Sequence, residues 1–143
     1  MSELQERFGK ALHGAARAWR QAMDRRLRHL GLSQAGWMTI AIAANADSPP
    51  SQSELADKLG VEGATMVAMV DRLVKAGLVR RETSKSDRRV KRVILTTAGA
   101  ELYDKLKAEA GQLRQELLSA VDARKLLSAT EFLERLQSGI EGM

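Results

Sequence analysis

The chain has 143 residues, 44% of them hydrophobic, which is enough for one domain that buries about two thirds of its unfolded surface. It carries a net charge of +5 and has no cysteine, which excludes disulfides, thiolate nucleophiles and cysteine-based zinc sites. Its first ten residues are mostly polar and no run of eighteen apolar residues occurs, so we expect a cytoplasmic protein with neither a signal peptide nor a membrane span.

The first part of the chain predicts two helices. From Leu4 to Leu30 apolar residues recur every three or four positions, which indicates one long helix that ends at Gly31. Ser33 is placed to cap a second helix, which we expect to be largely buried. Its inner face would contain Trp37, Ile40, Ala41 and Ala44. Two prolines at 49 and 50 prevent this helix from continuing.

A helix-turn-helix is predicted next. Ser51 and Glu54 form a capping-box pair at the start of a short helix over about 52–59, which Gly60 can end. A longer helix follows over about 62–76, and Gly77 ends it. Its inward residues would be Met66, Val70, Leu73 and Val74. In a helix-turn-helix the second helix is normally the one that enters the major groove of DNA.

A basic hairpin follows that helix. Residues 78–82 and 90–95 are rich in strand formers, and residues 83–89 would form the loop between them. Residues 80–92 contain seven basic and two acidic residues, a net charge of +5 that equals the net charge of the whole chain. Such a local excess is typical of a nucleic-acid contact. The alternative is a solvated hairpin whose charges only deter pairing with other strand edges.

Two more helices are predicted at the C-terminal end. Thr96 or Thr97 would cap the first, whose apolar stripe runs from Ala98 to Val121. Ser128 and Glu131 suggest a second capping box, at the start of the last helix. A helix-turn-helix followed by a hairpin is a winged helix, which is too small to cover long apolar stripes at both ends of the chain. We therefore expect a homodimer that presents two recognition helices, the second helix of each helix-turn-helix, to a pseudo-palindromic DNA site. A monomeric helical bundle is the alternative.

Residues 55–99 resemble the MarR family of winged-helix regulators, in particular its SlyA-like branch. The shared motifs are L-A-x-x-L-G, R-L-x-x-x-G-L-V-x-R, D-R-R and L-T-x-x-G, with weaker similarity at 17–27 and 32–37. The resemblance implies a mainly α fold, a winged helix-turn-helix with a two-stranded β-wing, as a single domain over 1–143. The DNA-binding lobe would be 33–96, between dimerisation helices at 1–30 and 97–143. It also implies a wing that reaches the minor groove and a small-molecule pocket beside the lobe.

Within that resemblance, Asp87 and Arg89 match a D-x-R motif in which the acid braces an arginine that enters the minor groove. We expect phosphate contacts from Lys85, Arg88 and Lys91, and from Ser51 and Ser53 at a helix N-terminus. The outward face of the recognition helix would present Gly63, Ala64, Thr65, Ala68 and Arg72. Close relatives carry an arginine where Ala68 stands, so we predict an A·T-leaning operator bound mainly through phosphates and DNA shape.

The resemblance also suggests an effector site. Arg17 and Trp37 match positions that line the pocket in SlyA-like proteins, and His13 lies one turn before Arg17. An arginine beside an indole suits a small aromatic carboxylate or a phenolic ligand. Core packing for Trp37 and an interface ion pair for Arg17 are the alternatives.

An enzyme is not expected. The two histidines lack metal-ligand spacing, and no phosphate-binding glycine motif occurs, so we predict no cofactor and no metal. The favoured function is a dimeric DNA-binding regulator, a repressor relieved by a small ligand. The alternative is a winged-helix interaction module whose basic wing binds an acidic protein partner.

Overall fold

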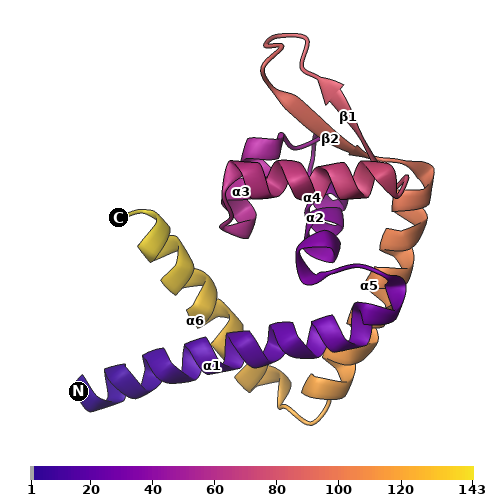
Figure 1. The fold of residues 1–143 in the computed structure, drawn as a ribbon. Coiled ribbons are helices and arrows are strands. Elements are labelled where there is room, and N and C mark those ends of the chain that lie inside the picture. Colours follow the sequence, from indigo (N-terminus) through magenta and orange to yellow (C-terminus); the bar gives the residue numbers. More distant parts are fainter. Residues whose placement is uncertain (1) are drawn as a thin grey trace. The chain divides into compact units, whose positions relative to one another are not determined.

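The computed structural model describes residues 2–143, which form a mainly helical chain with one β-hairpin (Figure 1). The chain divides into two compact units, Met1–Gly111 and Gln112–Met143. The elements are α1 (Ser2–Leu27), a 3-10 turn η1 (Arg28–Leu30), α2 (Gln34–Asn45), α3 (Gln52–Leu59), α4 (Gly63–Lys75), β1 (Val79–Thr83), β2 (Lys91–Leu95), α5 (Thr97–Leu118) and α6 (Ala123–Glu141). The predicted fold class is confirmed.

The first two helices follow the prediction closely. α1 ends at Leu27, and the chain tightens into η1 before Gly31 stops it with a left-handed φ of 81°. The hydroxyl of Ser33 accepts a hydrogen bond from the Gly36 amide at 3.2 Å, which confirms the predicted cap of α2. Ile40 and Thr39 are fully buried, whereas most of the helix is only half-buried.

The core of the winged helix is formed by α2, α3, α4 and the hairpin. Its fully buried side chains include Ile40, Leu55, Met66, Val70, Val79 and Val93. One predicted core residue of α4 is wrong: Val74 is 38% exposed, and Met69 is buried in its place. Both positions lie at the edges of the apolar stripe, on opposite sides. Which edge is covered depends on how α4 packs against its neighbours, and periodicity alone does not contain that information.

The hairpin is antiparallel, with Val79 opposite Leu95 and Thr83 opposite Lys91. The segment before α3 joins it: the Val93 amide donates to the Pro50 carbonyl at 2.8 Å, and Ser51 forms an isolated bridge with Arg92. Backbone groups of the segment that leads into α3 therefore attach the base of the wing to the helices.

The start of α5 is fixed against the turn that precedes β1. The Thr96 hydroxyl accepts from the Gly99 amide at 3.1 Å and donates to the Gly77 carbonyl at 2.6 Å, so Thr96, of the two candidate threonines, is the cap. Gly99 is needed here, because a Cβ at this position would overlap the carbonyl oxygen of Leu78. The threonine and glycine of the L-T-x-x-G motif are therefore the two residues that allow the start of α5 to pack closely against the backbone before β1.

In the second unit, α6 begins earlier than predicted. Asp122 caps it by accepting from the Arg124 amide at 2.8 Å, and Ser128 lies inside the helix, so the capping box at Ser128 is wrong. The residues between are good helix formers, and the helix extends upstream to the next available cap. Several of its large apolar side chains are exposed: Leu127, Phe132, Leu133 and Ile140.

Candidate nucleic-acid interface

The wing presents an arginine that a single carboxylate holds in place. The Arg89 guanidinium donates to both oxygens of Asp87 at 3.2 Å, and the Arg89 amide donates to the same carboxylate at 3.0 Å. These hydrogen bonds from the side chain and backbone of Arg89 lower the pKa of Asp87. The Arg89 side chain is 92% exposed, so its charge is oriented and yet open to a ligand.

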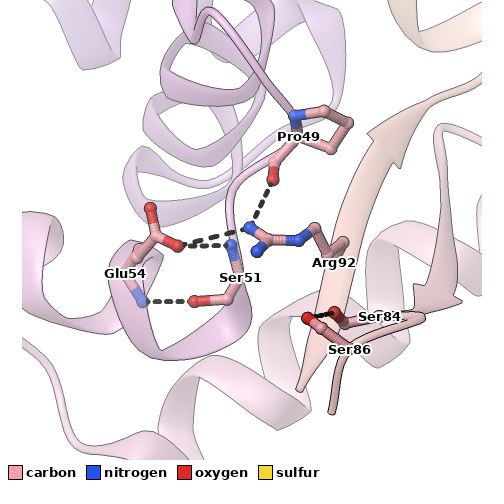
Figure 2. Close-up of polar contacts among 6 residues, drawn as sticks. All are labelled: Pro49, Ser51, Glu54, Ser84, Ser86 and Arg92. Atoms are coloured by element: carbon pink, nitrogen blue, oxygen red, sulfur yellow. Dashed lines mark hydrogen bonds and ion pairs between the residues drawn. The ribbon is translucent and has the colours of Figure 1, made fainter. Parts of the chain in front are cut away.

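The other predicted wing contacts are also at the surface. Lys85 and Arg88 are exposed on the loop, and Lys91 is exposed on β2, where its ammonium donates to the Thr83 hydroxyl at 2.9 Å. The loop between the strands is ordered by its own contacts: the Ser84 and Ser86 hydroxyls lie 3.0 Å apart (Figure 2). Its cations therefore project from a defined turn.

Two of the seven basic residues of the hairpin form hydrogen bonds and ion pairs with other segments of the protein. Arg92 donates to the Pro49 carbonyl at 3.0 Å and lies 3.5 Å from the Glu54 carboxylate, beside the capped start of α3 (Figure 2). Arg81 donates to Gln52 of α3 and is paired with Asp71 of α4. Charge counting missed these roles, because it does not show which acceptors the fold brings to the base of the wing.

The predicted outward face of α4 is at the surface. Gly63, Ala64, Thr65, Ala68 and Arg72 are all exposed. Only Thr65 and Arg72 carry polar side chains, and Arg72 also borders a surface pocket with Ser33 and Gly36 at the start of α2. The helix therefore offers few groups that could form paired hydrogen bonds with a base edge.

The two serines that were expected to bind phosphate have different environments at the start of α3. Ser51 is 7% exposed and forms both halves of the capping box with Glu54, accepting from the Glu54 amide at 3.1 Å and donating its own amide to the carboxylate at 3.4 Å. Ser53 is exposed. Ser51 is therefore the N-cap of α3, and its expected phosphate contact stays a prediction, whereas Ser53 presents the more exposed hydroxyl.

The three residues of the expected effector site lie in the first unit. His13 and Arg17 are exposed on α1, and Trp37 is half-buried on α2. The indole nitrogen of Trp37 is buried, and it has no hydrogen-bond partner within the part of the chain that the structure describes. A buried donor without an acceptor is uncommon and costs free energy.

Within residues 2–143, no group of three His, Asp or Glu side chains is arranged to hold a metal ion. None of the helices in this range is long and apolar enough to cross a membrane.

Comparison with known proteins identifies a matching family and solved structures with a similar fold. The sequence profile of the MarR family matches residues 32–91. The structure of the transcriptional regulator PA3341 is similar over 95% of this chain and 99% of that chain, with 38% identity and a TM-score of 0.87. A MarR transcriptional regulator from Methanosarcina mazei Go1 is similar over 96% and 99%, with 27% identity and a TM-score of 0.83. MepR from S. aureus, solved as a DNA complex, shares the fold at 20% identity over 92% and 97%, with a TM-score of 0.78.

Proposed function

This chain belongs to the MarR family of transcriptional regulators, and from that premise we propose that it binds double-stranded DNA as a homodimer at a pseudo-palindromic operator. The observation that carries the proposal is the exposed Arg89, held by Asp87 on a basic wing that directly follows an exposed helix face. MepR, which has the same fold, was solved in complex with DNA, and this supports the proposal. We also propose that the chain belongs to the SlyA-like branch, which its sequence at residues 55–99 resembles most.

The wing and the recognition helix would contribute unequally. The exposed face of α4 carries mostly small side chains, and Ala68 cannot form the bidentate contact with guanine that an arginine at this position would, a loss of about 1–3 kcal/mol of discrimination. Arg89 suits a narrow minor groove, where the negative potential is strong. We therefore expect an A·T-leaning operator, bound through DNA shape and through phosphate contacts from Lys85, Arg88, Lys91 and Ser53.

The homodimer is supported by exposed apolar residues near both ends of the chain. On α1 these are Leu4 and Phe8, and on α6 they include Leu127, Phe132 and Ile140. Apolar surface of this extent on a monomer would favour aggregation, whereas a two-fold interface would bury it. Two copies would present two wings to two half-sites about one helical turn apart.

We propose that the dimer is a repressor and that a small aromatic carboxylate or phenolic ligand releases it from DNA. The buried indole N–H of Trp37 supports a ligand, since an acceptor on that ligand would satisfy it. Arg17 is exposed and could pair with a carboxylate, and His13 could add a hydrogen bond.

Selection of bound sequences from a random duplex pool tests the proposal. We expect enrichment of a pseudo-palindrome whose half-sites are about 10 base pairs apart. Binding should weaken steeply with salt: three wing cations on each of two copies give a log-log slope of about −5. No enrichment and no salt-dependent DNA binding would contradict the proposal and favour the alternative, a basic wing that binds an acidic protein.

A further inference from the structure

We propose that Arg81 is a positioning residue that holds the wing and the recognition helix α4 in one fixed relationship, so that the minor-groove and major-groove contacts of each half-site are made together. This inference rests on the proposed DNA-binding function and deepens it. Arg81 is the middle residue of β1.

Arg81 has acceptors on two different helices. Its Nε donates to Gln52 Oε1 at 2.5 Å, at the first residue of α3. Its Nη2 donates to the Val67 carbonyl at 3.1 Å and lies 2.7 Å from Asp71 Oδ1, both on α4. The planar guanidinium presents its donors in a rigid fork, so these three contacts fix both the distance and the orientation of the strand relative to the helices.

The contact with the Val67 carbonyl is informative, because it holds the helix backbone itself. A side-chain ion pair alone would allow α4 to shift, because the flexible Arg81 side chain could follow the Asp71 carboxylate. The Asp71 side chain is 61% exposed, and an ion pair at such a surface adds little to the free energy of unfolding. The arrangement therefore constrains geometry more than it stabilises the fold.

The neighbouring arginine has a different environment. Arg80 is 59% exposed, and within residues 2–143 its ion-pair partner is Glu82 of the same strand, at 3.1 Å. It thus provides a matched control, with the same side chain and charge one residue away and no contact with either helix among the hydrogen bonds and ion pairs of the described residues.

Other connections would keep the protein folded without Arg81. The Val93 amide still bonds to the Pro50 carbonyl, and the Thr96 amide to the Leu78 carbonyl at 3.1 Å. What would change is the freedom of the hairpin to tilt against α4. A small tilt at the base displaces the wing tip, where Arg89 lies, by a larger distance.

The test compares Arg81→Met, Asp71→Asn and Arg80→Met in the full-length protein. For each, the dissociation constants are measured for the duplex selected with the wild-type protein and for an unrelated duplex, at several salt concentrations, together with the melting temperature. We expect Arg81→Met and Asp71→Asn each to lower the selectivity ratio about tenfold. These two substitutions change the net charge in opposite directions, so a shared loss of selectivity cannot be a charge effect. Arg80→Met should weaken binding to both duplexes in parallel and keep the ratio.

Three results would overturn the inference. An unchanged selectivity ratio in Arg81→Met would show that the brace does not position the wing. A fall in the salt slope of about 0.9 for each copy would identify Arg81 as a direct phosphate ligand. A lower melting temperature with intact selectivity would leave it only a structural role. If Arg81→Met does not fold, Asp71→Asn carries the same test. Failure of the proposed function is distinguishable, because the wild-type protein would then select no duplex.

Discussion

The guanidinium of Arg89 lies against the carboxylate of Asp87 through two hydrogen bonds of 3.2 Å, at the tip of a loop that otherwise carries unopposed cations. Among the loop cations Lys85, Arg88 and Arg89, only Arg89 has a carboxylate partner among the ion pairs of the described residues, so its guanidinium is held in one direction. Direction is what insertion into a groove requires. The acid is therefore part of the proposed DNA-binding surface, although it adds a negative charge to it.

We predict that Asp87→Asn raises affinity for unrelated DNA and lowers selectivity for the operator. The substitution adds one positive charge to the wing and removes the ionic partner of Arg89. Electrophoretic or anisotropy titrations with both duplexes measure the two effects separately. Loss of affinity for both duplexes in equal proportion would show that the brace has no directional role.

The lowered pKa of Asp87 determines the pH range in which the brace exists. The folded-state pKa of Asp87 lies below the ordinary value of 3.8. The stabilising contact of the ionised carboxylate with Arg89 is therefore fully present above pH 3.8, and it is lost only as the pH falls through the folded-state pKa. Asp87 should therefore stay ionised between pH 6 and 8. Any pH dependence of operator affinity in this range should be the same in the wild-type protein and in the Asp87→Asn variant. A titration step in that range that disappears in the variant would contradict this assignment.

Gly99→Ala should destabilise the protein by about 1–3 kcal/mol, measured by chemical denaturation. The new Cβ would overlap the Leu78 carbonyl oxygen, and the start of α5 would have to move away from the turn before β1. Gly9→Ala is the control, since its Cβ would meet no atom within 4 Å and it lies inside a helix. That substitution should be neutral or stabilising by up to about 1 kcal/mol.

Substitutions of the two serines at the start of α3 should have different effects, one on the stability of the fold and the other on DNA affinity. Ser51→Ala removes the cap and should cost about 0.5–2 kcal/mol of stability. Ser53→Ala should leave the melting temperature unchanged and weaken binding to all duplexes by a similar factor, as expected for a phosphate contact. A stable Ser51→Ala protein with weakened DNA binding would reverse the two roles.

The effector proposal predicts a saturable change in tryptophan fluorescence on titration with a simple aromatic carboxylate. Trp37→Phe separates its signal from that of Trp19, and Arg17→Ala should weaken the titration by removing the partner of the carboxylate. Added ligand should also release the operator. No saturable change below millimolar concentrations would contradict the proposed site.

The features that were predictable from sequence are local ones. Ser33 caps α2, Ser51 and Glu54 form their capping box, and Gly60 adopts φ of 69° at the end of α3. Each depends on backbone groups within a few residues, so a short pattern contains the necessary information. The D-x-R pair belongs to the same class, since Asp87 and Arg89 are two residues apart.

The features that were missed depend on contacts distant in sequence. The exchange of Val74 for Met69 in the core reflects the packing of α4. Arg81 reaches Gln52, 29 residues away, and Arg92 reaches the Pro49 carbonyl, 43 residues away. Arg81 is the last residue of the R-L-x-x-x-G-L-V-x-R motif, which sets it apart from Arg80, but that motif does not identify its acceptors on α3 and α4. The lone acid on the exposed side of α4, Asp71, was a usable signal.

We propose that the wing contributes more to operator recognition than the recognition helix α4, whose exposed face has few polar side chains. Titration of the selected operator with the wild-type protein, Arg89→Ala and Thr65→Ala tests it most directly. We predict that Arg89→Ala weakens binding by about 1–3 kcal/mol and Thr65→Ala by clearly less. The reverse ranking, with Thr65→Ala the more damaging substitution, would contradict the account.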